Sequence, residues 1–194
     1  MKELYNLQRD IGVVENITLN EIPDIQLTHR NDVAVFSGSI TQKRFNSQDI
    51  DKFRMLRDFL GKSIVVYGVV ARKLSPEFAS LLDFRGAVSH AEMMKKLTDF
   101  RYALLAYYQG EPNYDLCAPL KLYEYVAAGC RVISINKNAG LLRVAARYPN
   151  LICFIDDSMS PHTVLDEHAY AKEREMFLQE ALKSNDRFAI EITT

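Results

Sequence analysis

A lysine and a glutamate three residues apart are the side chains in this sequence best placed to bind a charged ligand. They are Lys121 and Glu124, within CAPLKLYEYVAAGCRVISI, residues 117 to 135. Pro119 suits the first position of a helix, and Gly129 suits its end, because glycine adopts the left-handed conformation that follows a last helical turn. On the predicted helix, the lysine lies one turn in and the glutamate lies beside it on the same face.

The start of a helix binds anions, because its first N–H groups are unpaired and the positive end of its dipole lies there. The dipole is worth about 0.3–1 kcal/mol to a phosphate, and a lysine adds a charge-assisted hydrogen bond of about 1.5–3 kcal/mol. Glu124 repels phosphate but accepts hydrogen bonds from a ribose diol. The pair therefore suits a nucleotide diphosphate. The alternative is a surface ion pair worth about 0.2–0.5 kcal/mol, which the spacing alone favours.

Apolar strands alternate with helices from residue 32 onward, and this pattern predicts the surroundings of the pair. The expected strands are 33–40, 63–70, 84–88, 102–108, 131–135 and 151–156, and the expected helices are 47–60, 89–97, 119–128, 140–148 and a last one ending near Lys183. Ser47 and Ser89 are expected to cap the first two helices. Strands that are nearly all apolar imply a parallel sheet covered on both faces. We expect an α/β fold, a Rossmann-like doubly wound parallel sheet of about six strands in one domain.

Ligands of such sheets bind at the carboxyl ends of the strands. Three features fall on that edge: the Gly38-Ser39 turn, the loop 109–118 and the start of the helix at Pro119. We expect residues 1–30 to form an interdomain-type lead-in, residues 31–183 the domain and residues 184–194 a C-terminal tail.

The composition is that of a globular protein with a real core, with 48% apolar and 25% charged residues and a net charge of −1. This balance argues against nucleic-acid binding, which needs a basic face. Cys117, Cys130 and Cys153 show no paired spacing, and the start has no apolar signal core, so we expect reduced thiols in a cytoplasmic protein. The longest apolar run, 102–108, is too short to span a bilayer, which leaves peripheral membrane association open.

The pattern P-x-K-x-x-E-Y-x-A-x-G over residues 119 to 129, followed by Arg-Val-Ile, resembles the signature helix of GT-B glycosyltransferases. More narrowly, it resembles the C-terminal, donor-binding domain of the group 1, family 4-like class. The order of elements agrees over residues 32 to 156. The resemblance implies that Lys121 contacts the donor's diphosphate and that Glu124 contacts the ribose hydroxyls.

Other roles also follow from the resemblance. Gly38 and Ser39 would form the tight turn against the phosphates. The base would lie near Gly86, Ala87, Val88 and Ser89, and the sugar would face the loop that carries Glu111, Asn113 and Asp115. Many relatives have an arginine at the position of Ser39 and a further glutamate at the position of Leu116. The basic candidates here are Lys43 and Arg44, each of which is equally well explained as a solvated loop charge.

The function implied is that of the nucleotide-sugar-binding domain of a retaining glycosyltransferase that acts on an acceptor hydroxyl in glycan or polysaccharide biosynthesis. No metal and no other cofactor is expected, because fixed cations and backbone amides can neutralise the leaving diphosphate. The catalytic base would belong to an N-terminal acceptor-binding domain, in cis or in trans, so the isolated chain is expected to be inactive. Two alternatives stay open: a non-catalytic or split-enzyme partner subunit, and a nucleotide-sugar epimerase-type domain.

Two weaker patterns have simpler explanations. Asp49-Ile50-Asp51 matches a metal-binding D-x-D, but it falls in the first turn of a predicted helix, where acidic residues favour the dipole. His162 and His168 lack a third ligand of suitable spacing, so exposed histidines are favoured over a metal site. The sequence contains neither a dinucleotide fingerprint nor a P-loop.

Overall fold

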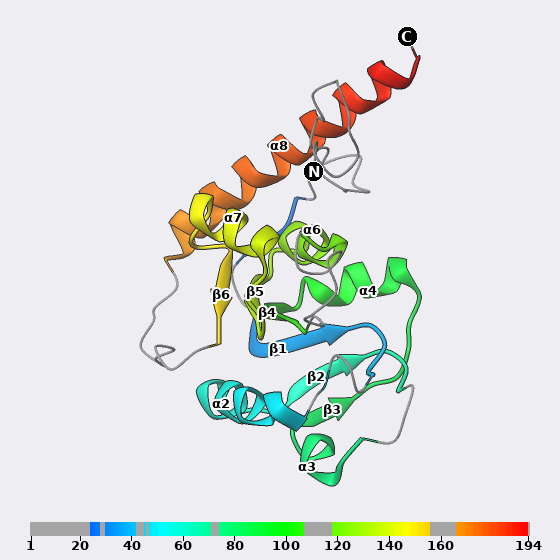
Figure 1. The fold of residues 1–194 in the computed structure, drawn as a ribbon, viewed down its shortest axis with the longest axis vertical. Coiled ribbons are helices and arrows are strands. Elements are labelled where there is room, and N and C mark those ends of the chain that lie inside the picture. Colours follow the sequence, from blue (N-terminus) through cyan, green and yellow to red (C-terminus); the bar gives the residue numbers. More distant parts are fainter. Residues whose placement is uncertain are drawn as a thin grey trace, which may run out of the picture.

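The structure, a computed structural model, describes residues 24–27, 30–41, 45, 47–70, 74–106, 118–155 and 166–193, with side chains up to residue 183. Its centre is a six-stranded sheet in the order β3-β2-β1-β4-β5-β6, with every neighbouring pair parallel (Figure 1). The strands are β1 Asn31–Ser37, β2 Ile64–Tyr67, β3 Leu82–Phe84, β4 Phe100–Leu105, β5 Arg131–Ser134 and β6 Ile152–Phe154. The predicted Rossmann-like sheet is confirmed.

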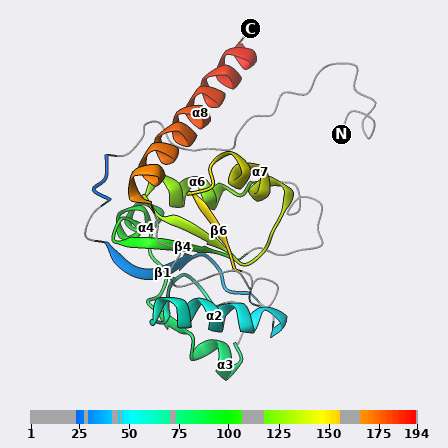
Figure 2. The same cartoon turned by 90° about the vertical axis from the view of Figure 1, so that its left-hand side faces the viewer.

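Helices cover both faces of this sheet, as Figure 2 shows. They are α2 Ile50–Leu60, preceded by the 3-10 turn η1 Ser47–Asp49, then α3 Pro76–Ala79, α4 His90–Leu97, α6 Leu120–Ala127, α7 Ala139–Arg147 and α8 Glu167–Thr193. Alternate side chains of each strand enter opposite cores. In β1, Val35 belongs to the core that includes residues of α4, α6, α7 and α8, whereas Ala34 and Phe36 belong to the core that includes residues of α2 and α3. Burial on both faces explains why the strands are almost entirely apolar.

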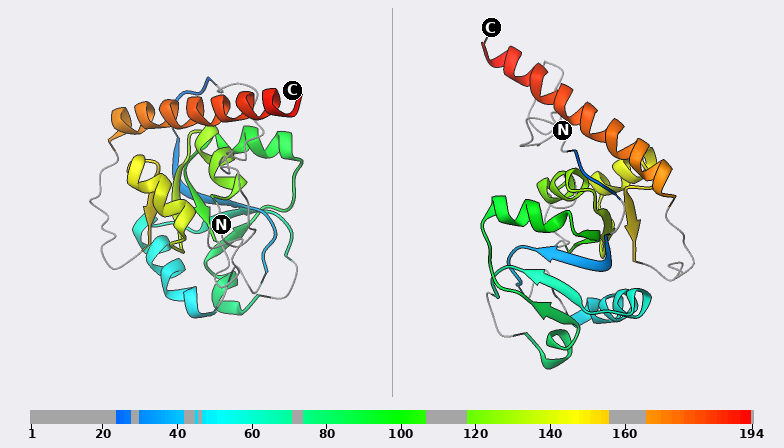
Figure 3. Two further views of the ribbon diagram at one scale, coloured as in Figure 1. Left: turned by 45° about the horizontal axis from the view of Figure 1, so that its top comes forward. Right: turned by 180° about the vertical axis from the view of Figure 1, so that it is seen from behind.

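Helix α8 lies across the outer side of α6 and α7 (Figures 1 and 3). Phe177 fastens it there, because its ring stacks on Tyr123 of α6 with 5.0 Å between centroids and meets Tyr148, just after α7, edge-on at 5.6 Å. We expected this helix to end near Lys183, but it continues to Thr193 and extends beyond the sheet layers. Residues 184–193 contain no glycine or proline to end it.

The sequence prediction was wrong at three other places. The third strand is Leu82–Phe84 rather than 84–88, because Gly86 has a φ of 77°, a left-handed conformation far from that of extended β backbone. Ser47 begins η1 instead of capping α2, which Asp49 precedes. Helix α3 was not expected, although Ser75 and Pro76 are a local start signal for it.

Candidate functional site

A buried carboxylate lies where α4 meets α6. The Nζ of Lys121 is 2.6 Å from Oε2 of Glu124, and Nε2 of His90, the first residue of α4, is 3.1 Å from Oε1 of the same side chain. The side chain of Glu124 is 8% exposed, while those of Lys121 and His90 are 33% and 64% exposed. The two predicted residues are therefore brought together, and a third residue that sequence reasoning missed joins them.

Helix α6 begins and ends close to the predicted limits. Pro119 has an extended backbone, with φ −71° and ψ 147°, and is the residue before the helix rather than its first residue. Gly129 has a φ of 84° and ends the helix in the left-handed conformation, as predicted. A Cβ at this glycine would also collide with Ile25, so the absence of a side chain lets the segment before β1 pack against the helix end.

Two buried arginines bind the carboxyl end of α6. Arg174 of α8 donates hydrogen bonds to the carbonyl oxygens of Val126 and Ala127 at 3.0 and 2.7 Å. Arg30 donates to the carbonyl oxygen of Gly129 from just before β1. Cations are stabilised at this negative end of the helix dipole, and burial lowers the pKa of Arg174. The arginines hold the far end of α6 and leave its amino end directed at the carboxyl edge of the sheet.

The site sits at the point where the order of the strands reverses. β1 pairs with β2 on one side and with β4 on the other, so the chain continues to one side of β1 first and to the other side later. The crevice outside the carboxyl ends of β1 and β4 is therefore the expected ligand site of this topology. The hydroxyl of Tyr125, fully buried on α6, lies 3.1 Å from the N of Ser37 and 3.2 Å from its Oγ, at the last residue of β1. Burial raises the pKa of Tyr125 to about 12, so the phenol stays neutral. This contact joins α6 directly to the residue that precedes Gly38.

Glycines line the edge after the first three strands. Gly38, Gly68 and Gly86 follow β1, β2 and β3 in turn. The N–H of Gly38 donates to the carbonyl oxygen of Tyr67, and that of Gly68 donates to the carbonyl oxygen of Gly86. A Cβ on Gly68 would overlap the carbonyl oxygen of Gly38, so the backbones touch without side chains between them. Gly68 was not predicted as a site residue, although a glycine directly after an apolar strand was a usable signal.

The remaining predicted residues divide into two groups. Ser39 lies exposed after β1, and residues 86–89 connect β3 to α4 and lead straight into His90. Ser89 caps α4 as expected, since its Oγ accepts a hydrogen bond from the N–H of Glu92 at 3.2 Å. Lys43, Arg44, Glu111, Asn113 and Asp115 lie outside the described residues.

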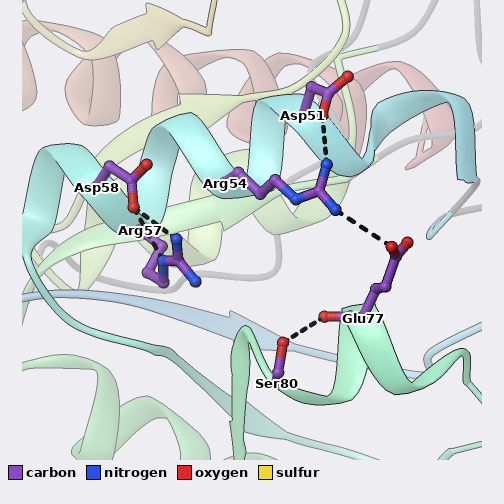
Figure 4. A network of polar contacts seen from close by, with 6 residues as sticks. All are labelled: Asp51, Arg54, Arg57, Asp58, Glu77 and Ser80. Carbon is purple, nitrogen blue, oxygen red and sulfur yellow. Dashed lines mark hydrogen bonds and ion pairs between the residues drawn. The ribbon is translucent and has the colours of Figure 1, made fainter.

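The D-x-D pattern serves helix α2. Asp49 accepts a hydrogen bond from Lys52 at 3.0 Å, and Asp51 accepts one from Arg54 at 2.7 Å. Arg54 also reaches Glu77 of α3 at 3.4 Å, in the exposed network that Figure 4 shows. Over the described ranges, no three His, Cys, Asp or Glu side chains gather where they could hold a metal ion. The same part of the chain contains no helix that is long and apolar enough to cross a membrane.

The parallel sheet, with the 119–129 segment beside its carboxyl edge, has the fold of the C-terminal domain of a GT-B glycosyltransferase. A TarM mutant from S. aureus, in complex with fondaparinux, alpha-GlcNAc-glycerol and UDP, matches 96% of this chain with a TM-score of 0.61 and 13% identity. AviGT4, a glycosyltransferase involved in avilamycin A biosynthesis, matches 84% with a TM-score of 0.52 and 15% identity. The matched region covers 40% of the TarM chain and 51% of the AviGT4 chain.

Comparison by sequence finds no counterpart: no family model matches the chain, and no curated protein does. A UDP-GlcNAc 2-epimerase from Methanocaldococcus jannaschii matches 84% of this chain with a TM-score of 0.43 and 10% identity, and the matched region covers 46% of the epimerase chain. That similarity is too slight to support the epimerase alternative.

Proposed function

We propose that this chain is the donor-binding domain of a glycosyltransferase and that it binds the nucleoside diphosphate of a nucleotide-sugar. The observation that carries the proposal is the buried Glu124 carboxylate beside Lys121 at the amino end of α6. A carboxylate is seldom buried without a structural or binding role. This one lies beside the strand-order reversal, where ligands of doubly wound sheets bind.

The diphosphate would be bound by three kinds of group. Lys121 is a third exposed, so its ammonium group can reach a ligand while its stem stays packed. The first N–H groups of α6 supply further donors, and the glycine at position 38, whose own N–H is bonded to Tyr67, lets a phosphate approach the turn without a side chain in the way. In a transfer reaction these groups would stabilise the negative charge that develops on the leaving diphosphate, with no need of a metal. Ser39, with Lys43 or Arg44, remains a prediction for the same role.

The nucleoside would lie against α4. A carboxylate has about four lone-pair sites, so Glu124 can accept hydrogen bonds from the two hydroxyls of a ribose in addition to the His90 contact. Residues 86–89 lead directly into His90, whose ring touches Glu124, so a base beside this segment would place its ribose near the carboxylate. The sugar would then face the loop of Glu111, Asn113 and Asp115, as the sequence predicts.

The acceptor hydroxyl and the catalytic base would come from a second domain, in cis or in trans. The chain spans about half or less of the two glycosyltransferases that share its fold. We therefore expect it to bind a donor by itself but to transfer sugar, in glycan or polysaccharide biosynthesis, only together with an acceptor-binding domain. Adding such a domain should restore transfer from a labelled nucleotide-sugar. Hydrolysis of the donor by this chain alone would count against a non-catalytic subunit, and epimerisation of the donor without an acceptor would favour the epimerase alternative.

Binding is tested with UDP, GDP and ADP in a thermal-shift series, followed by calorimetry with the best ligand. At a ligand concentration of 100 times Kd, one-site binding stabilises a folded protein by about 2.7 kcal/mol, so the effect is measurable. Lys121→Ala should weaken binding of the diphosphate by about tenfold or more, with no comparable loss of nucleoside binding. The control is Lys95→Ala, which removes one positive charge from an exposed residue of α4. If none of the nucleoside diphosphates binds the unmodified chain, the proposal is wrong.

A further inference from the structure

Both oxygens of the proposed ribose-binding carboxylate already have a partner. Oε2 of Glu124 faces the Lys121 ammonium at 2.6 Å, and Oε1 faces the His90 ring at 3.1 Å. Each carboxylate oxygen has two lone pairs, but the ammonium lies against Oε2 at 2.6 Å, so a ribose hydroxyl competes with it for that oxygen. We propose, as an inference that rests on the proposed function, that Lys121 leaves Glu124 for the diphosphate when the ligand binds. Phosphate and ribose then bind cooperatively, while His90 stays and orients the carboxylate.

The side chains are built for these different tasks. Lys121 is partly exposed and has four rotatable bonds, so its ammonium can swing from the carboxylate to a phosphate on the same side of α6. Glu124 is held among the fully buried neighbours Tyr123 and Tyr125 and has little room to turn. His90 has only two side-chain torsions and stands on the first turn of α4, which Ser89 caps. The lysine therefore has the longest reach of the three side chains, and the two torsions of His90 give it fewer alternative positions.

The balance of charge gives the direction of the exchange. In the free protein, Lys121 neutralises a buried carboxylate, and a separated buried charge is costly. A diphosphate carries more negative charge than one carboxylate and attracts the ammonium, while the ribose hydroxyls replace it on Oε2. A nucleoside without phosphates must displace the lysine and offers it nothing in return. The phosphates therefore improve the binding of the ribose, and the reverse holds by linkage.

The first test compares the best of UDP, GDP and ADP with its free nucleoside, on the unmodified chain and on Lys121→Met. The variant should bind the diphosphate about tenfold more weakly or worse, yet bind the nucleoside more tightly, because Oε2 is free. A lysine that only adds positive charge gives no such reversal of sign. Lys95→Met should leave both affinities unchanged. Weaker or equal nucleoside binding by Lys121→Met would overturn the exchange.

The second test isolates the role of His90. It measures the ratio of the affinity for the diphosphate to the affinity for its 2′-deoxy form. His90→Ala should bring that ratio close to one, because Oε1 loses the donor that orients the carboxylate. His90→Gln should restore most of the preference, since its amide nitrogen reaches close to the position of Nε2. A structural defect would lower both affinities together and leave their ratio unchanged. An unchanged ratio in His90→Ala would remove this residue from the site.

These outcomes are separable from failure of the proposed function. If the unmodified chain binds the diphosphate but the nucleoside and 2′-deoxy comparisons do not shift, the donor site stands and the exchange is wrong. If the unmodified chain binds no nucleoside diphosphate, both fail. Thermal unfolding of each variant without ligand confirms that it is folded, and Lys121→Ala repeats the first comparison if Lys121→Met does not fold.

Discussion

The hydroxyl of Tyr125 and the backbone N–H of Ser37 lie 3.1 Å apart, and this hydrogen bond joins helix α6 to the end of β1. The two residues are 88 positions apart in the chain. Both are buried, so water does not compete for the bond. Because Ser37 precedes Gly38 and Tyr125 follows Glu124, the bond holds the two halves of the proposed phosphate and ribose site in register.

Tyr125→Phe should lower the free energy of unfolding by about 1–3 kcal/mol, because the Ser37 N–H loses this buried partner. It should also weaken nucleoside diphosphate binding, since the glycine turn is no longer held against α6. Denaturant unfolding and calorimetry measure the two effects.

Tyr170→Phe is the matched control for that change. The Tyr170 hydroxyl is also buried but has no hydrogen-bond partner among the described residues. Its removal should leave stability unchanged or increase it, because an unpaired buried hydroxyl costs about 1–3 kcal/mol. Equal losses in the two variants would contradict the role given to the Tyr125 bond.

Gly68→Ala should destabilise the chain by about 1–3 kcal/mol or more, since the added methyl group overlaps the carbonyl oxygen of Gly38. Nucleoside diphosphate binding should fall with it. Gly61, at the end of α2, has a left-handed backbone, with φ 64°, and nothing lies within 4 Å of its added Cβ. Gly61→Ala should cost about 1–2 kcal/mol of backbone strain and leave ligand affinity unchanged.

Arg174→Met should cost about 3 kcal/mol or more of folding free energy, because two charged hydrogen bonds to the end of α6 are lost. Arg174→Lys should recover only part of this, since one ammonium does not reproduce the fork of the guanidinium. Arg147→Met removes an exposed ion pair with Glu180 and should cost at most about 1 kcal/mol. Urea unfolding of the three variants compares them, and a loss in Arg147→Met as large as that in Arg174→Met would contradict this ranking.

The Cys130 thiol should resist alkylation in the folded protein at pH 8. Burial raises its pKa from 9.0 to about 12, and the reactive form is the thiolate. The neutral thiol stabilises the fold fully below about pH 9, and this contribution is lost as the pH rises through about 12. A chain with Cys117→Ser and Cys153→Ser leaves this thiol alone for iodoacetamide labelling followed by mass spectrometry. Rapid labelling before the protein unfolds would show that the thiol is accessible.

Local patterns in the sequence were enough to predict the layered parallel sheet, most of its helices and the pairing of Lys121 with Glu124. Such features depend on neighbours within a few positions: apolar periodicity, a capping serine at Ser89, and a glycine able to end a helix at Gly129. The errors at the third strand and at the end of α8 concern boundaries, where local signals are weakest.

The packed structure alone brought His90 to Glu124, Ser37 to Tyr125, and Arg30 and Arg174 to the end of α6. The first two pairs join residues 34 and 88 positions apart, and their meeting depends on the order in which the strands assemble. That order results from both cores packing at once, which no short segment specifies. A buried carboxylate becomes a binding site here because tertiary packing decides which side chains surround it and which edge it faces.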